Sequence, residues 1–352
     1  MFGLGKSKAV VGLDVGSSAV KAVEIKTAGK KLKVTACGFE PIPPASIVDG
    51  AIVDSTAVAD AIRRLFQTHA IRTKEVAASL SGNAVIVKKI NLPVMSETEL
   101  ADSIFWEAEQ YIPFDVQDVN LDYQILDPGT GPQSKGTMDV LLVAAKKDKI
   151  ADYTSVITQA GRTPVVVDVD AFALQNAYEA NYGADDQVVV LLNAGASAMN
   201  INILRGDQSL FTRDISTGGN SYTEAIQKEL NLSFELAEQA KRGGPADGAS
   251  FDEVRPILHA VTENVLLEMQ KTFDFFKVTS TLERIDRVLL SGGASLVDGF
   301  ARAVEDRFGA PVESLDPFRR LEFDSAKFGM DDVGRASAAV AVGLALRKAG
   351  DR

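Results

Sequence analysis

Residues 10–26, V-V-G-L-D-V-G-S-S-A-V-K-A-V-E-I-K, decide the fold that we predict for this chain. The first part is a short apolar run that reaches Asp14, and residues 19–25 alternate between apolar and polar side chains. These patterns predict a buried strand followed by a half-buried strand. Residues 16–18, Gly-Ser-Ser, join the strands in a tight turn, and glycine tolerates the backbone angles that such a turn needs.

The turn is a candidate anion site. Its backbone N–H groups and the hydroxyls of Ser17 and Ser18 can point at one spot, beside Gly16. Asp14 lies next to that spot, where a carboxylate can hold a hydrated Mg²⁺, and Lys21 adds a positive charge from the second strand. Taken alone, the hairpin is equally compatible with an ordinary β-turn whose serines only cap it.

The composition indicates an ordinary globular protein with room for two cores. The 352 residues are 46% hydrophobic and 24% charged, and a domain usually takes about 100–200 residues. The net charge of −11 argues against nucleic acid or an anionic membrane as the main partner. Cys37 is the only cysteine, so no disulfide can form within the chain. His69 and His259, the only histidines, are expected to be structural or surface residues, which argues against a zinc site.

No segment predicts a membrane anchor. No apolar run approaches the roughly 20 residues that span a bilayer. The start, residues 1–8, is too short an apolar segment for a signal peptide, and residues 345–352 do not form an amphipathic anchor. We therefore expect a soluble, cytoplasmic chain.

The residues after the hairpin predict a mixed α/β unit with an insertion. Strands are predicted at residues 31–38, 75–80 and 84–90, and a helix begins at Asp54 or Ser55. Pro93 marks a boundary. An inserted unit of helix, two strands and helix follows at residues 92–163, with elements at 96–111, 121–126, 138–145 and 148–160 and a Pro- and Gly-rich loop at 128–132.

The helix predicted at residues 96–111 carries more large apolar residues than one stripe holds. At about 100° per residue, Leu100, Ile104 and Ala108 share one face, while Phe105 and Trp106 lie beside it. We favour the interpretation that these two aromatics widen a core-facing stripe. The alternative is an exposed aromatic surface for a partner.

Residues 188–204, V-V-V-L-L-N-A-G-A-S-A-M-N-I-N-I-L, repeat the opening pattern of apolar strand, small-residue turn and alternating strand. A repeated hairpin arises by chance far less often than one copy, so we predict a second, similar half. A strand at 164–169 precedes this half, and one at 285–290 leads into the turn Gly292-Gly293-Ala294, which exposes backbone N–H groups to a ligand. The other helices are predicted at residues 171–182, 222–230, 233–242, 252–277, 297–308 and 333–347.

Three glycine turns that follow strands, in two halves with duplicated hairpins, resemble the actin-like ATPase superfamily, which includes actin, the heat-shock chaperones, hexokinase-type sugar kinases and the division protein FtsA. The resemblance implies an α/β fold of two lobes, each a mixed sheet with flanking helices, and ATP with Mg²⁺ between the lobes. The inserted unit resembles the extra subdomain of FtsA. The implied division is residues 1–91 and 164–183 for lobe I, 92–163 for the inserted subdomain, 184–331 for lobe II with a small helical subdomain at about 221–283, and 332–352 for a C-terminal helix on lobe I.

The resemblance also implies the nucleotide site. Residues 12–18 and 193–197 match the two phosphate loops, and residues 238–242, E-Q-A-K-R, resemble the adenosine-contacting E-x-x-K-R of the chaperones. Asp170 falls near the residue that orients the attacking water, although we assign no catalytic residue. Lys241 and Arg242 also fit solvated charges at a helix end, and we make no prediction for Gly218 and Gly219. The candidate cofactor-binding residues are Asp14, Gly16, Ser17, Ser18, Lys21, Asn193, Gly195, Ala196, Ser197, Glu238, Lys241, Arg242, Gly292, Gly293 and Ala294, with Asp14 also holding Mg²⁺ through water.

Four shorter strings resemble the PilM family, the cytoplasmic actin-like proteins of type IV pilus assembly. They are residues 49–52 (D-G-A-I), 107–114 (E-A-E-Q-Y-I-P-F), 121–126 (L-D-Y-Q-I-L) and 167–174 (V-D-V-D-A-F-A-L). The resemblance implies a scaffold that binds the cytoplasmic N-terminal peptide of the inner-membrane protein PilN, in a groove between lobe I and the inserted subdomain. It also implies contacts with other inner-membrane and motor components of the pilus, self-association, and attachment to the membrane through PilN only.

Asn193 departs from the superfamily, which usually has Asp there. An amide removes one negative charge from the site that holds Mg²⁺ and water, so we expect ATP binding with slow or absent hydrolysis. Three alternatives remain at this point, and the first is a degenerate site that holds no nucleotide. A small-molecule kinase would need a carboxylate base, for which Asp168, Asp170 and Asp214 are candidates by location. An FtsA-like filament former would polymerise with ATP.

Overall fold

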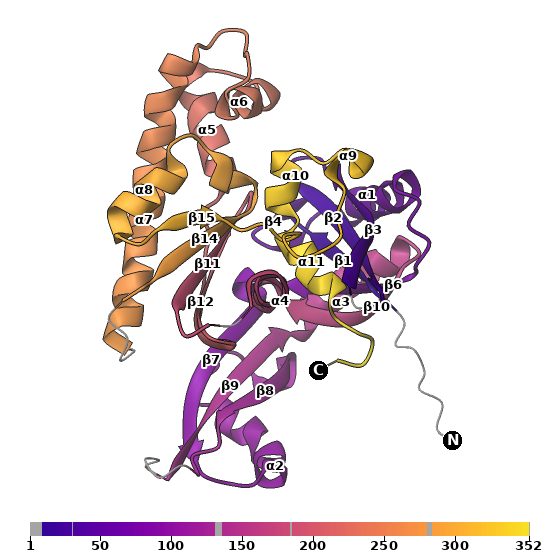
Figure 1. Cartoon of the computed structure of the whole chain (residues 1–352), viewed down its shortest axis with the longest axis vertical. Helices are drawn as coiled ribbons and strands as arrows, with labels where there is room; N and C mark the ends of the chain where they lie inside the picture. Colours follow the sequence, from indigo (N-terminus) through magenta and orange to yellow (C-terminus); the bar gives the residue numbers. More distant parts are fainter. Residues whose placement is uncertain (1–8, 30, 131–135, 184, 280–283, 352) are drawn as a thin grey trace.

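The computed structural model describes residues 9–29, 31–130, 136–183, 185–279 and 284–351. The start at residues 1–8 and the end of the loop predicted at 128–132 therefore lie outside the described residues. Figure 1 shows two lobes side by side and a smaller inserted subdomain that projects away from both of them. No helix in the described part of the chain is both long and apolar enough to cross a membrane.

Lobe I is built on a five-stranded sheet in the order β10-β6-β1-β2-β3. The strands are β1 (Val11–Val15), β2 (Ala19–Ala28), β3 (Lys31–Pro41), β6 (Glu75–Leu80) and β10 (Thr163–Val169). One face packs on α1 (Ser55–Thr68) and α3 (Lys147–Gln159). Of the two predicted cap residues, Asp54 and Ser55, it is Asp54 whose side chain caps α1. The short strands β4 (Ile47–Val48) and β5 (Ala51–Ile52) form a separate hairpin.

Lobe II is built on a second five-stranded sheet in the order β13-β12-β11-β14-β15. The strands are β11 (Val188–Ala194), β12 (Met199–Arg205), β13 (Gln208–Ile215), β14 (Arg287–Ser291) and β15 (Val312–Ser314). Its outer face is covered by α5 (Gly219–Leu230), α6 (Phe234–Lys241), α7 (Phe251–Thr279) and α8 (Phe300–Phe308), and the 3-10 turn η3 (Gly293–Leu296) follows β14.

The two sheets have the same topology. Starting from the antiparallel edge, the strand orders are β3-β2-β1-β6-β10 and β13-β12-β11-β14-β15, with the first three strands antiparallel and the rest parallel. The repeat seen in the sequence as one hairpin is therefore a repeat of a whole sheet.

Two helices fill the space between the sheets. On α4 (Asp170–Tyr182), Leu174 and Tyr178 pack against lobe II residues such as Leu191, while Ala173 packs with residues of lobe I. The second helix is α11 (Ala339–Ala345), which lies against β1 and α4. Its Gly343 has no room for a side chain, because a Cβ there would lie 1.6 Å from the Ala173 carbonyl oxygen.

The inserted subdomain is a three-stranded sheet in the order β7-β9-β8 with one helix. It comprises β7 (Val85–Pro93), α2 (Glu97–Ala108), β8 (Val119–Asp127) and β9 (Thr137–Lys146), with the 3-10 turns η1 (Gly82–Ala84) before β7 and η2 (Val116–Asp118) before β8. The predicted strand at 84–90 is therefore in this sheet and not in lobe I. The helix predicted at 148–160 packs in the lobe I core as α3 and not in the insertion.

The end of the chain also differs from the prediction. The single helix expected at 333–347 is broken into α10 (Asp332–Ser337) and α11, and α10 lies against η3 of lobe II. Phe318, Leu321 and the residues around α9 (Ser325–Phe328) pack against β2 and β3, so this segment, assigned to lobe II from the sequence, returns to lobe I.

Candidate functional site

The first candidate turn, between β1 and β2, is a tight hairpin with an ion pair beside it. The Gly16 N–H donates to the Ala19 carbonyl oxygen at 3.2 Å. Asp14 and Lys21 are cross-strand partners, and the Lys21 Nζ lies 2.9 Å from the Asp14 Oδ2. The prediction that Gly16 supplies unusual backbone angles is wrong, because its φ is not positive. A Cβ there would lie 2.8 Å from the Lys21 Nζ, the far end of a flexible side chain, and 3.2 Å from the Ala19 carbonyl oxygen.

The second candidate turn, between β11 and β12, repeats this backbone. The Gly195 N–H donates to the Ala198 carbonyl oxygen at 2.9 Å. The cross-strand partners beside it are Asn193 and Asn200, at the positions that Asp14 and Lys21 occupy in lobe I. The Asn193 Nδ2 donates to the Asn200 Oδ1 at 3.0 Å, so a neutral amide pair replaces the ion pair.

A chain of hydrogen bonds leads from the second turn to Gly82, at the junction between lobe I and the inserted subdomain. The Asn200 Nδ2 donates to the Asp214 Oδ1 at 2.8 Å, and the backbone N–H of Gly82 donates to the Asp214 Oδ2. Burial raises the pKa of Asp214 above the ordinary aspartate value, although both hydrogen bonds oppose the shift. We call Asn193, Asn200, Asp214 and Gly82 the inter-lobe relay.

Asp170, at the start of α4, lies between the two turns. The Ser79 hydroxyl donates to its Oδ1 at 2.5 Å. Burial and then the charge of Asp14 raise the pKa of Asp170 to about 6, with a smaller contribution from Asp214, while hydrogen bonds from Ser79 and Ser81 oppose the shift. Asp14, Asp170 and Asp214 are thus close enough to affect one another electrostatically, although the described residues contain no group of three side chains placed to hold a metal ion directly.

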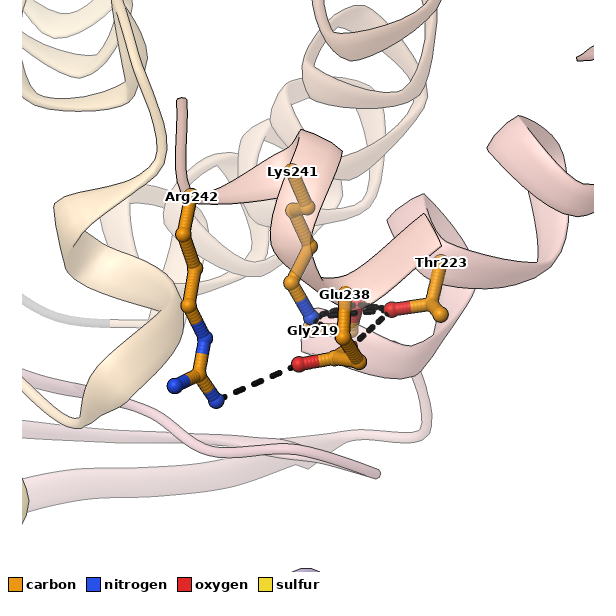
Figure 2. Close-up of polar contacts among 5 residues, drawn as sticks. All are labelled: Gly219, Thr223, Glu238, Lys241 and Arg242. Carbon is orange, nitrogen blue, oxygen red and sulfur yellow. Dashed lines mark hydrogen bonds and ion pairs between the residues drawn. The ribbon is translucent and has the colours of Figure 1, made fainter. Parts of the chain in front are cut away.

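Figure 2 shows the predicted adenosine motif on α6 as a compact polar cluster. The Lys241 Nζ pairs with the Glu238 Oε1 and donates to the Thr223 Oγ1 at 2.9 Å and the Gly219 carbonyl oxygen at 3.1 Å. The Arg242 Nη2 lies 3.3 Å from the Glu238 Oε2 and its side chain is 62% exposed. Burial alone would raise the pKa of Glu238, but Lys241 and the other partners lower it below its usual value.

The third glycine turn meets this cluster. Gly292 has a φ of +83°, and a Cβ there would lie 2.2 Å from the Ala194 carbonyl oxygen, so only glycine fits. A Cβ on Gly219 would lie 3.3 Å from the Ala294 Cβ and 3.6 Å from the Lys241 Nζ. The start of α5, the end of α6 and η3 therefore form one site.

Gly218 is a residue whose role the sequence analysis missed. A Cβ on Gly218 would lie 2.6 Å from the carbonyl oxygens of both Gly195 and Ala196, and the Gly219 N–H donates to the Gly195 carbonyl oxygen at 2.9 Å. This glycine pair supports the second turn from behind. The signal available in the sequence was the Gly-Gly pair itself, just before the helix predicted at residues 222–230.

The arrangement has the features of an anion site at both turns. Ser17 and Ser197 are half-buried and Ser18 is exposed, so their hydroxyls can reach a ligand. The cation at the first turn is Lys21, whose charge is shared with Asp14. These features fit phosphate groups bound to the turns, with an adenosine near the cluster of Figure 2.

Comparisons with known proteins give the same fold over nearly the whole chain. A solved PilM-PilN type IV pilus biogenesis complex matches with 30% identity and a TM-score of 0.85, covering 97% of this chain and 98% of that chain. The ethanolamine utilization protein EutJ from Carboxydothermus hydrogenoformans matches with 15% identity and a TM-score of 0.55 over 98% of this chain and 92% of that chain. MreB5 of Spiroplasma citri matches with 14% identity and a TM-score of 0.53, covering 96% of this chain and 94% of that chain. The fold is the actin-like ATPase fold.

The sequence comparisons are more specific. The cell division protein FtsA of Streptococcus pneumoniae serotype 2 (strain D39 / NCTC 7466) is 23% identical over an alignment of 348 positions that covers 87% of this chain and 75% of FtsA. A family model described as type IV pilus assembly protein PilM matches residues 12–349. The chain belongs to the PilM family of type IV pilus assembly proteins.

Proposed function

We propose that this chain is an ATP-binding scaffold of the type IV pilus inner-membrane complex that binds the cytoplasmic N-terminal peptide of PilN. The observation that carries the proposal is the match, across nearly the whole chain, to a PilM solved in complex with PilN. In this proposal the chain stays at the cytoplasmic side of the inner membrane through PilN. Contacts with other pilus components and self-association stay predictions.

For the nucleotide, we propose that the turns at Gly16 and Gly195 hold the phosphates, with Lys21 as the cation and Asp14 binding Mg²⁺ through water. The remaining candidates are Ser17 and Ser18 at the first turn, Asn193, Ala196 and Ser197 at the second turn, and Glu238, Lys241, Arg242, Gly292, Gly293 and Ala294 near the adenosine. Mg²⁺ would neutralise phosphate charge there. The neutral Asn193 favours binding with little turnover, because it lacks the negative charge that would help hold Mg²⁺ and its water.

Hydrolysis is tested separately from binding. We expect ATP to bind with no more than slow phosphate release, measured with a coupled phosphate assay. Robust Mg²⁺-dependent release that Asp14→Ala abolishes would overturn this part of the proposal. The Asp60→Ala variant is the matched control, because Asp60 is on α1, away from the turns.

For the peptide, we propose a groove between the inserted subdomain, lobe I and lobe II. A cavity of about 220 Å³ lies there, lined by the Gly82–Val87 region, by Val169 and Ala171 of lobe I, and by Thr212 to Asp214 of lobe II. β7 and β13, which line it, are both outer strands of their sheets. Outer strands offer unpaired backbone groups to an extended peptide, which supports this position.

We further propose that the inter-lobe relay couples the two sites. Asp214 lines the groove and also bonds Asn200, which bonds Asn193 beside the second turn. A nucleotide that moves the second turn would therefore move a wall of the groove, and the same coupling energy would act on the nucleotide when peptide binds.

The experiment is calorimetric titration of a synthetic PilN N-terminal peptide, from the same organism, into the chain with and without Mg-ATP. We expect saturable one-to-one binding, and an Asp214→Asn variant in which peptide affinity no longer responds to Mg-ATP. Val87→Asp, which places a charge in the groove, should weaken peptide binding at least tenfold, or by about 1.4 kcal/mol. Val53→Asp, at an exposed position outside the groove, is the control and should leave peptide affinity unchanged. Absence of peptide binding under both conditions would overturn the proposal.

A further inference from the structure

The outward face of α2 is an unpartnered aromatic surface. Leu100, Ile104 and Ala108 bury the inner side of the helix against the inserted sheet. On the other side, Phe105 is 42% exposed and Trp106 is 70% exposed, which corrects the expectation that these rings join the core. In Figure 1, α2 lies at the tip of the inserted subdomain, far from lobe II and its helices.

The same segment carries uncompensated negative charge. Residues 96–118 contain no lysine, arginine or histidine, and they contain the acidic residues Glu97, Glu99, Asp102, Glu107, Glu109, Asp115 and Asp118. Glu99 and Asp115 accept hydrogen bonds from backbone N–H groups at helix starts, which does not neutralise them. The nearby Lys88 and Lys147 donate to the carbonyl oxygens of residues 111 and 117. Within the described residues, none of the seven carboxylates has a basic partner.

We propose that the outward face of α2 is a docking surface for a basic amphipathic segment of a partner protein. Asp102 and Glu109 lie three or four positions from Phe105 and Trp106, so they share one side of the helix with both rings. An arginine or lysine can contact the Trp106 ring and a neighbouring carboxylate together, and apolar residues of the segment can cover Phe105. Exposed aromatic anchors surrounded by complementary charge are typical of binding hot spots.

The charge selects this occupant over two others. An anionic membrane surface would meet carboxylates of the same sign, so lipid docking is disfavoured. A second copy of the chain carries a net charge of −11 and would also be repelled. The surface is separate from the proposed peptide groove, because no α2 residue lines that cavity.

Trp106 is the only tryptophan of the chain, so its fluorescence reports on this surface alone. The probe is a synthetic helical peptide of leucine and lysine, with the leucines on one face. The controls are a peptide of the same composition in scrambled order and one with glutamate in place of lysine. We expect a saturable blue shift of Trp106 emission with the probe and with neither control peptide. Added salt that reduces the screening length well below about 10 Å should weaken binding of the probe.

Two variants test the chemistry. Phe105→Ser keeps the fluorescent reporter and should weaken the probe at least tenfold. Asp102→Lys with Glu109→Lys should weaken it by a similar factor and remove the salt dependence. Phe39→Ser is the matched control, since Phe39 is 45% exposed on lobe I, and it should bind the probe as the parent chain does. Circular dichroism and the melting temperature verify that each variant is folded.

Several results would overturn the proposal. They are an unchanged Trp106 emission, equal binding of the scrambled peptide, or a Phe105→Ser variant as tight as the parent. A Trp106 shift with anionic vesicles would assign the surface to lipid, and sedimentation showing an oligomer that Phe105→Ser dissociates would assign it to a second copy. Phe105→Ser should bind the PilN peptide normally, so failure at this surface and failure at the groove are distinguishable.

Discussion

The two hairpin turns have the same backbone and different chemistry. In both turns a glycine N–H donates to the carbonyl oxygen three residues later, between strands of matching topology. Beside the first turn the cross-strand pair is Asp14 and Lys21, which is charged. Beside the second it is Asn193 and Asn200, which is neutral and continues into the inter-lobe relay. The duplicated sheet thus provides equivalent positions, and one cross-strand pair at each turn decides whether it contributes charge or a link to the other lobe.

The largest expected effect concerns Asp170, which lies between the turns. Its folded pKa of about 6 exceeds the ordinary value of 3.8, so the folded chain binds this proton more tightly than the unfolded chain. Stability should therefore fall as the pH rises from about 4 to about 6, with the full cost present above 6. Asp170→Asn should remove this dependence and stabilise the chain at pH 7 by between about 2 and 3 kcal/mol, measured by urea unfolding.

The pKa of Asp170 also shows which of two neighbouring carboxylates, Asp14 or Asp214, affects it more strongly. Asp14 raises the pKa of Asp170 more than Asp214 does. Asp14→Asn should thus lower the Asp170 pKa, followed by carbon-13 NMR, further than Asp214→Asn. If the two substitutions lower the Asp170 pKa equally, the proposed electrostatic difference between the turns is wrong.

The next effect is on nucleotide binding. Lys21→Gln removes the cation of the first turn and leaves the Asp14 carboxylate unpaired beside the phosphates. We expect ATP affinity to fall by a factor of about 10–100, since a hydrogen bond to a charged group contributes about 1.5–3 kcal/mol. Lys26→Gln, on the same strand and 52% exposed, is the control. Calorimetry with ATP measures both, and equal affinities would show that the first turn does not supply the cation.

A smaller effect separates the two glycines. A Cβ on Gly195 would lie 2.8 Å from the Ala198 backbone oxygen, whereas a Cβ on Gly16 would lie 3.2 Å from the corresponding Ala19 oxygen and 2.8 Å from the Lys21 Nζ, which is the end of a flexible side chain. Gly195→Ala should therefore destabilise the chain by about 1–2 kcal/mol, as overpacking does. Gly16→Ala should leave the melting temperature nearly unchanged and should weaken ATP binding instead. Identical unfolding curves for the two variants would contradict this distinction.

The smallest effect tests the amide pair. Asn193→Asp restores the usual carboxylate but loses the Nδ2 donor to Asn200, whose own Nδ2 is held by Asp214. We expect a loss of about 1 kcal/mol in urea unfolding at pH 7. Asn120→Asp, at an exposed position of β8, is the control. If the two variants lose equal stability, the amide pair has no special role.

The sequence predicted most of the elements, because periodicity reports which faces of a segment are buried. Both hairpins, α4 and α7 lie where the patterns placed them within a few residues. The sequence predicted less well which strand or sheet each element packs against. β7 is a mixed apolar and polar strand, V-I-V-K-K-I-N-L-P, whose pattern fits either the lobe I sheet or the inserted sheet, and only its register with β9 decides between them. α3 was assigned to the inserted subdomain for the same reason, since an amphipathic pattern shows that one face of a helix is buried but not which sheet covers it.

Within the candidate site, residues with distinctive chemistry were identified and residues that support them were not. Asp14 and Lys21 were predicted because opposite charges beside a glycine turn suggest a site. Gly218 was not, since its role depends on the lack of a side chain behind another loop. Asp214 was named only by its location, because the Gly82 N–H that it accepts lies 132 residues away in the sequence.

The position of α11 has a consequence for the order in which the chain folds during synthesis. Val340 and Leu344 complete the face of the lobe I sheet that includes Val10 and Ala77. The lobe II sheet, by contrast, uses strands from residues 188 to 314. A ribosome therefore releases every strand of lobe II before it releases the helix that closes lobe I. The half that is synthesised first is the half that finishes folding last.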